Sequence, residues 1–182
     1  MKTEIITKAF PKFLENEILT LLEKVSLTGD FRPVGNFIVK INGEFLDIPY
    51  RIYFELPNKN QLTEKELLIL CCFFTRHHNG FTRQKCLEQI ISSDEYWVTP
   101  FIIQLLGEYV IEMLFVIKNN LDEKLLRNMV RFSEENPIFF ETTKHRIISY
   151  WNCYYRTRFP IKESYVGFEI VNAIEEIKHA SE

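Results

Sequence analysis

Two adjacent histidines, His77 and His78, are the residues of this chain whose types most directly suggest chemistry. They stand in the stretch FFTRHHNGFTRQKCLEQII (residues 73–91), where Arg76 precedes them and Cys86 follows. Imidazole binds zinc and titrates near neutral pH, so the stretch could hold a metal ion or supply an acid–base group. Neighbouring side chains on a helix point about 100° apart, however, so one small ion rarely takes both.

The same stretch is also typical of a corner between two helices. Arg76, His77 and His78 would occupy the last turn of a helix, where cations interact favourably with the helix dipole. Gly80 would then end the helix in a left-handed conformation, which glycine adopts without strain. We favour the interpretation as a corner between two helices over that as a metal or acid–base site. It predicts that Gly80 has a positive φ, that the two imidazoles diverge, and that Gly80→Ala costs roughly 1 kcal/mol of stability.

Carboxylates provide the second set of candidate catalytic groups. Glu108 and Glu112 interrupt the apolar run VTPFIIQLLGEYVIEMLFVI (residues 98–117), which we interpret as a buried helix whose carboxylates line a polar face or pair with arginine. Glu141 and His145 are four residues apart, whereas di-iron bundles need Glu-x-x-His from each of two helices. The pattern favours a surface pair. No Gly-x-Ser-x-Gly, phosphate-binding glycine loop or His-Glu-x-x-His occurs.

Four cysteines provide the remaining candidate ligands: Cys71, Cys72, Cys86 and Cys153. No Cys-x-x-Cys pair is present, so a zinc ribbon or a thioredoxin-like site is not expected. Cys71 and Cys72 fall in an apolar helical pattern, where thiols behave as small hydrophobic groups. We therefore expect reduced thiols, no disulfide, no bound zinc and no cofactor.

The most unusual segment is KHRIISYWNCYYRTRFPIK (residues 144–162), which combines five cations with five tyrosine, tryptophan and phenylalanine side chains and has no acidic residue. Tyr, Trp and Arg dominate protein-interface hot spots, and aromatic side chains also stack on the bases of single-stranded nucleic acid. On a regular helix Ile147, Trp151, Tyr154 and Arg158 share one face, and we expect Trp151 to belong to the core. The expected binding residues are Arg146, Tyr150, Tyr155, Arg156 and Arg158.

A structural interpretation of this segment stays open beside the functional one. A core helix would result if its arginines were paired internally by Glu108, Glu112 or the glutamates of the C-terminal stretch EIVNAIEEI (residues 169–177). A surface role would instead leave the basic side chains available to an acidic partner or a phosphate backbone.

The elements that must position these residues begin with a β-hairpin. Asn42-Gly43 separates two runs rich in β-branched and aromatic residues, and Asn-Gly tolerates the positive φ angles of a type I′ turn. We expect a small antiparallel hairpin or a three-stranded meander, with strands at about 36–41, 44–48 and 50–56. Pro49 cannot donate a ladder hydrogen bond, so it should mark an edge or a bend.

Helical periodicity accounts for most of the remaining sequence. A helix over residues 11–27 has Pro11 in its first turn and ends before Gly29. Thr63 and Glu66 form a capping-box pattern, Asp122 caps a later helix, and Pro100 and Pro137 suit the first turns of two others. These signals predict six or seven helices.

Residues 66–106 resemble a single HEAT-type unit. The resemblance rests on one helix, a short turn, FTRQKCLEQI and then WVTPFIIQLL as the next leading helix. No second copy is visible, because the chain runs on after Leu106 without the expected turn, and a solenoid needs at least three units. The predicted fold class is therefore mainly α: an irregular multi-helix domain with a HEAT-like helical hairpin and a small N-terminal antiparallel β-hairpin.

Composition limits the class of protein. The 182 residues are 46% hydrophobic and 26% charged, which is typical of a folded globular chain. We expect one domain over 1–182, with an N-terminal helix in 1–32, the hairpin in 33–58 and a helical body in 62–182. The formal net charge of −3 gives no overall attraction to nucleic acid or to an anionic membrane. Neither a signal-peptide core nor a charge-free membrane span is visible, so we expect a cytoplasmic protein.

These observations favour a non-enzymatic protein-binding domain, of the kind found among inhibitors, adaptors and immunity proteins. Its partner would be another protein with an acidic surface, engaged by the aromatic and basic helix. The first alternative is a nucleic-acid-binding protein of the helical-repeat kind that uses Arg146, Arg156 and Arg158. The second is an enzyme that uses Glu108, Glu112, His77 or His145.

Overall fold

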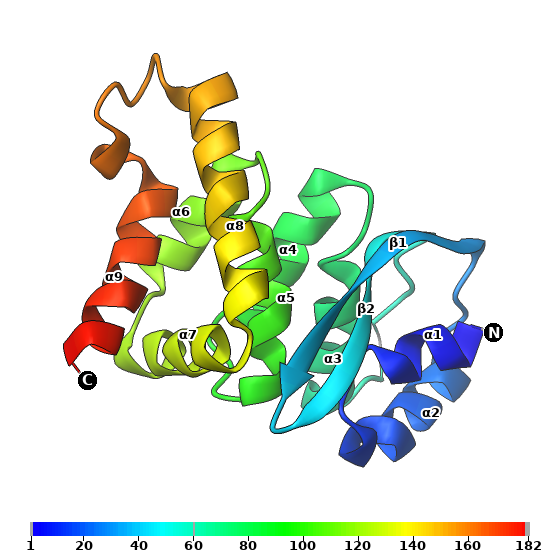
Figure 1. The fold of residues 1–182 in the computed structure, drawn as a ribbon. Helices are drawn as coiled ribbons and strands as arrows, with labels where there is room; N and C mark the ends of the chain where they lie inside the picture. The colour runs from blue at the N-terminus through cyan, green and yellow to red at the C-terminus, as the bar shows by residue number, and fades with distance from the viewer. Residues whose placement is uncertain (1, 60, 181–182) are drawn as a thin grey trace. The chain divides into compact units, whose positions relative to one another are not determined.

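The computed structural model describes residues 2–59 and 61–180, and the chain divides into two compact units, Met1–Ile90 and Ile91–Glu182 (Figure 1). Helices dominate both units, and the described residues contain one sheet, an antiparallel pair of strands in the first unit. The predicted fold class, mainly α with an N-terminal β-hairpin, is confirmed. The expectation of one domain over 1–182 stays a prediction.

The hairpin consists of β1 (Gly29–Ile41) and β2 (Glu44–Phe54). Asn42 and Gly43 both have positive φ, 53° and 84°, which confirms the turn. The three-strand alternative is wrong, because β2 continues through Pro49, which lies opposite Asn36. Ile41 and Glu44 flank the turn as a hydrogen-bonded pair, and hydrogen-bonded pairs alternate with non-hydrogen-bonded pairs along the hairpin. Asn36 and Pro49 form a non-hydrogen-bonded pair, so the nitrogen of Pro49 points away from β1. Proline at this position therefore removes no bond between the two strands.

Side chains alternate across the hairpin as the two-residue strand period requires. The inward-facing side chains are buried: Phe37, Val39, Ile41, Leu46, Ile48, Ile52 and Phe54. Phe54 stacks on Phe73 of helix α3 (Glu64–Phe74), with ring centroids 5.9 Å apart. The hairpin is thus stabilised by burial against a helix, as a two-stranded sheet needs in water.

Helices precede the hairpin. They are α1 (Lys2–Lys8), the short 3-10 turn η1 (Lys12–Leu14) and α2 (Glu15–Lys24). Helix α1 was not predicted from the sequence, and Gly29 was expected just after the end of a helix. Helix α2 ends earlier, because Val25 already has extended backbone angles. Gly29 instead begins β1, with a φ of +110°.

The capping box predicted at Thr63 is present. The Thr63 hydroxyl accepts from the Glu66 amide at 3.2 Å, and the Glu66 carboxylate accepts from the Thr63 amide at 2.8 Å. Glu66 also accepts from Lys24 at 2.6 Å, which joins α2 to α3. Helix α4 (Gly80–Ile90) packs against α3 as a helical hairpin, and the apolar side chains of Cys86, Leu87, Ile90 and Ile91 are buried.

The second unit begins with the 3-10 turn η2 (Tyr96–Val98) and α5 (Thr99–Leu106), followed by α6 (Ile111–Asn119) and α7 (Glu123–Glu135). Pro100 lies in the first turn of α5, and Asp122 caps α7 by accepting from the Leu125 amide at 2.8 Å, as predicted. The apolar run 98–117 is not one helix. It turns at Gly107, so the statement that the chain runs on after Leu106 is wrong.

Four helical elements follow α7. Helix α8 (Pro137–Tyr150) continues into a π-helical turn, η3 (Trp151–Tyr155), and a loop with the 3-10 turn η4 (Lys162–Ser164) leads to α9 (Val166–Ala180). Helix α5 packs against α6, α7 and α8, while α9 packs against α6 and α7. With α1 added and the apolar run divided, the described residues form nine α-helices rather than six or seven. Among the described residues 2–59 and 61–180, every helix is too short or too polar to traverse a lipid bilayer.

The position of Gly29 yields a stability prediction. A Cβ at this residue would lie 2.5 Å from the carbonyl oxygen of Tyr53, and the backbone already has a φ of +110°. We expect Gly29→Ala to lower the free energy of unfolding by more than about 1 kcal/mol, measured by urea denaturation. Gly107→Ala is the matched control, because its φ of −85° suits alanine and its nearest neighbour is the flexible side chain of Arg146. Equal losses in the two variants would contradict this account.

Candidate functional site

The segment Arg76–His78 joins the hairpin rather than extending helix α3. The Ile52 amide donates to the carbonyl of Arg76, and the His78 amide donates to the carbonyl of Ile52, both at 3.0 Å. Gly80 then begins α4 and is not among the glycines with positive φ. The prediction that Gly80 ends a helix in the left-handed conformation, with its expected cost for Gly80→Ala, is therefore wrong. The reason is tertiary: the backbone bonds to a strand far away in sequence.

His77 is fixed in one neutral form by backbone contacts. Its Nδ1 accepts from the Asn79 amide at 3.1 Å, so its Nε2 carries the proton and donates to the Phe54 carbonyl at 2.8 Å. Burial, reinforced by neighbouring His78, lowers the pKa of His77 below its usual range. Both ring nitrogens are thereby engaged, and His77 has no lone pair to offer to a metal ion.

The two rings do not diverge as predicted. The centroids of His77 and His78 lie 4.2 Å apart, and exposed His78 stacks on Tyr53 at 5.1 Å. Buried Arg83 closes the corner, because its Nη1 donates to the carbonyls of His77 and His78 at 2.9 Å each. Arg76, also buried, donates through Nη2 to the Tyr50 carbonyl at 3.3 Å. These contacts give the corner a structural role.

The candidate carboxylates are dispersed. Glu108 is buried in the loop between α5 and α6, whereas Glu112 is exposed in the first turn of α6. Glu141 forms an ion pair with Lys144 rather than with the exposed His145. Among the described residues, no three histidine, cysteine or acidic side chains are grouped so that they could hold a metal ion.

Three of the four thiols are buried. Cys71 and Cys72 lie in the apolar helix α3, as predicted, and Cys86 lies in α4, while Cys153 is exposed. Hydrogen bonding with the Cys86 thiol, aided by the Lys59 ammonium 3.6 Å from its sulfur, lowers the pKa of Cys71 to about 7. Because the Cys71 side chain has no exposed surface, this thiol is not accessible to a protein-sized or peptide substrate.

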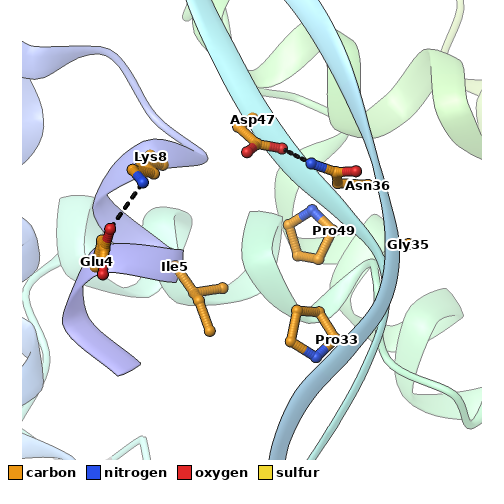
Figure 2. A pocket seen from close by; sticks show the side chains of 8 residues that line it. All are labelled: Glu4, Ile5, Lys8, Pro33, Gly35, Asn36, Asp47 and Pro49. Atoms are coloured by element: carbon orange, nitrogen blue, oxygen red, sulfur yellow. Dashed lines mark hydrogen bonds and ion pairs between the residues drawn. The ribbon is translucent and has the colours of Figure 1, made fainter. Parts of the chain in front are cut away.

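A cleft of about 380 Å³ lies between α1 and the hairpin (Figure 2). The polar side chains drawn there are paired with one another. Lys8 donates to Glu4 at 2.8 Å, and Asn36 donates to Asp47 at 2.5 Å. A groove of about 480 Å³ between α8 and α9 is similar, since Lys144 bridges Glu141 and Glu175 across it. In the cleft the pairs lie within α1 and within the hairpin, whereas the pair of Lys144 with Glu175 joins α8 to α9.

Three tyrosines gather where α8 ends. The ring of Tyr109, from the loop between α5 and α6, lies 6.1 Å from that of Tyr150 and 6.3 Å from that of Tyr154, and the latter two lie 6.1 Å apart. Tyr109 is 53% exposed and Tyr154 is 66% exposed, while Tyr150 is half-buried. The cluster therefore presents a broad aromatic surface that still has polar hydroxyls.

Two exposed arginines follow the tyrosines in the chain. Arg156 lies over the Trp151 ring, 5.8 Å from its centroid, and donates to the Asn152 side chain at 3.3 Å. Arg158 lies 5.3 Å from the centroid of Phe159. Both arginines are exposed, and the rings beneath them limit their motion. We call Tyr109, Tyr150, Tyr154, Arg156 and Arg158 the tyrosine–arginine surface.

The π-helical turn explains why helical spacing mispredicted this segment. A π turn advances by fewer degrees per residue than an α-helix, so residues after position 150 rotate away from their expected face. Tyr154, expected beside buried Ile147, is exposed. Trp151, expected in the core, is only half-buried, and its Nε1 donates to the Phe159 carbonyl at 2.8 Å.

The predicted binding residues divide into two groups. Tyr150, Arg156 and Arg158 belong to the tyrosine–arginine surface. Tyr155 is a positioning residue, because its ring stacks on buried Tyr165 at 5.4 Å and its hydroxyl donates to the Tyr109 carbonyl. Arg146 is half-buried and lies along Gly107, one helical turn before Tyr150.

Tyr109 and Tyr154 were missed as candidate binding residues. The available signal for Tyr109 was Gly107, which interrupts the apolar run and turns the chain two residues before it. Tyr154 had no such signal, since its exposure depends on the π turn.

Comparison with known proteins gives no match: no protein-family model fits the chain, and no curated protein or solved structure resembles it significantly. The resemblance of residues 66–106 to a HEAT-type unit gains no support from these comparisons. The division at Ile90 also separates its first two helices from its third.

The environment of His77 predicts a pH dependence of stability. Its pKa is lowered in the folded protein from an ordinary value of 6.5, so below that pH the unfolded chain binds a proton that the folded chain resists. We expect the free energy of unfolding to fall as pH decreases from about 6.5 towards the lower folded value. Urea denaturation of wild type and His77→Gln at a series of pH values measures this. Gln retains a donor and an acceptor without titrating, so an equally steep fall in that variant would contradict the assignment.

Proposed function

We propose that this chain is a non-enzymatic binding protein whose partner is another protein with an acidic surface, docked on the tyrosine–arginine surface. The observation that supports this most strongly is the gathering of three tyrosine rings and two exposed arginines around a π-helical turn. Tyrosine and arginine provide large contact areas and several hydrogen bonds, and they dominate the binding energy of protein interfaces. Single π turns within α-helices are rare and are frequent at functional sites.

The support of this surface also favours binding. Tyr155 ties the π turn to the loop that presents Tyr109, and Trp151 ties it to the following loop through the Phe159 carbonyl. The exposed rings are thus held in place before a partner arrives. Less conformational entropy is then lost on association, which raises affinity.

A protein partner fits this surface better than nucleic acid. Affinity for a phosphate backbone grows with the number of phosphates neutralised, and Arg156 and Arg158 are the exposed cations of segment 144–162. Lys144 of the same segment is ion-paired with Glu141 and Glu175, and Lys162 lies over the ring of Phe168 at 4.6 Å. Two cations on a chain of net charge −3 suit a local acidic patch more than an extended polyanion.

The dispersal of the candidate acid–base groups supports a non-enzymatic role. Glu108 is buried and Glu112 is exposed, Glu141 forms an ion pair with Lys144, and both ring nitrogens of His77 are engaged by backbone groups. A small binding protein of this kind would act as an inhibitor, an adaptor or an immunity-type protein. We propose the cytoplasm as its location, since the buried thiols are compatible with a reducing compartment.

The double variant Arg156→Ala/Arg158→Ala tests the proposed surface. We expect capture of the native partner from cell lysate to weaken by about tenfold or more, because hot-spot arginines each contribute more than about 1 kcal/mol. Tyr154→Ala should weaken capture as well. Mass spectrometry of the captured material, with and without nuclease treatment, identifies the partner, and thermal unfolding should be nearly unchanged because these side chains are exposed.

The matched control removes two cations from another exposed site, as Lys124→Ala/Arg127→Ala on α7. It should leave capture intact. Full-affinity capture by the arginine variant would overturn the proposed surface. Loss of all captured material on nuclease treatment, with a steep dependence of binding on salt, would favour nucleic acid instead.

A further inference from the structure

The groove between α8 and α9 has two ends of different chemistry. The two helices pack against each other and run in opposite directions, so the end of α8 lies beside the start of α9 (Figure 1). Glu141 and Lys144 of α8 lie towards one end of the groove, together with Glu175 of α9. The other end is lined by apolar side chains and by Lys162 of the turn η4.

The charges at the first end compensate one another. Lys144 forms ion pairs with Glu141 and Glu175, and its ammonium nitrogen lies 3.0 Å from a carboxylate oxygen of Glu175. Lys178 lies 3.9 Å from the other carboxylate oxygen of Glu175. Two ammonium groups thus face two carboxylates, so this end of the groove has no net formal charge for a ligand to neutralise.

Lys162 at the other end has no acidic partner among the residues that the structure describes. Its ammonium lies 4.6 Å from the centroid of the Phe168 ring, which holds the charge over the floor of the groove. The groove has three lysines and two glutamates, so its formal charge is +1 with its two histidines neutral. Lys162 carries this charge and is half-buried, and its field is therefore less screened by water than that of a fully exposed lysine.

The floor of the groove beside Lys162 is apolar. Phe168 and Val171 of α9 and Ile147 of α8 are buried there, and Ile148 is 37% exposed. The groove has a volume of about 480 Å³, which lies within the usual range of small-molecule sites. A stable protein interface covers a far larger area, so the groove suits a small molecule better than a second protein.

We propose that this end of the groove binds a small monocarboxylate with an apolar chain. The carboxylate pairs with Lys162, and the chain lies along Phe168, Val171 and Ile148. A single negative charge matches the formal charge of the groove, and the chain gains free energy by leaving water for an apolar floor. The proposal is independent of the proposed function, which concerns the tyrosine–arginine surface.

Titration of the isotope-labelled chain with sodium octanoate, followed by NMR, tests the site. We expect saturable shifts of amide signals in α8, η4 and α9, centred on Phe168, with a dissociation constant of about 1 mM or below. Octanamide has the same chain without the charge, and it should bind about tenfold or more weakly because it cannot form an ion pair with Lys162. The absence of saturable shifts, shifts centred outside the groove, or equal affinity for the two ligands would overturn the proposal.

Two variants separate the charge of the site from its shape. Lys162→Gln should bind octanoate about tenfold or more weakly and octanamide as before, because only the charge is lost. Asn172→Trp should weaken both ligands, since a bulky side chain at this exposed position of the lining fills the groove. Thermal unfolding verifies that both variants fold. Lys124→Gln on α7 removes another exposed lysine and should leave both affinities intact. Octanoate affinity equal to that of wild type in Lys162→Gln or in Asn172→Trp would overturn the proposal.

Discussion

The backbone of Ile52 is the point on which the first unit depends. Its amide and carbonyl are bonded to Arg76 and His78, so a strand and the end of a helix are fixed to each other through two hydrogen bonds. Buried backbone groups must be paired because water cannot reach them, and this requirement decides the path of residues 75–79. The carbonyls of His77 and His78 are in turn satisfied by Arg83, and the His77 ring by Phe54 and Asn79. His77 and His78, whose residue types suggested a metal site, therefore have a structural role in the turn between α3 and α4.

The same requirement organises the end of α8. The chain turns at Gly107, and the next residues leave a carbonyl, that of Tyr109, for which Tyr155 supplies a hydroxyl donor. The indole N–H of Trp151 donates to the Phe159 carbonyl in the same way. Two large aromatic side chains therefore stabilise two loops, and the rings that remain, Tyr109 and Tyr154, are exposed. These contacts hold the aromatic surface in place, and the proposed function rests on this surface.

The tyrosine–arginine surface would bind through side chains, with arginines supplying charge and tyrosines supplying area. An interruption of regular structure matters for this surface, because the π turn exposes Tyr154.

The sequence by itself determined the features that depend on local chemistry. Asn42-Gly43 specified the hairpin turn because few other residue pairs tolerate positive φ twice. Thr63 with Glu66, Asp122, Pro100 and Pro137 marked helix starts because their side chains or rings act within one turn of the backbone. Burial of Cys71 and Cys72 followed from helical periodicity, and so did the mainly α class.

Tertiary structure alone decided the features that depend on distant partners. Residues 76–78 left the helix because Ile52 lies beside them, and Gly80 therefore began a helix instead of ending one. Pro49 stayed within β2 because its nitrogen faces away from β1, which only the register reveals. Arg156 and Arg158 were predicted at the surface from composition, but the ring arrangement of Tyr109, Tyr150 and Tyr154 depends on a loop and a π turn that meet only in the folded chain. Helical periodicity carries no information about such contacts, because it describes each segment without its neighbours.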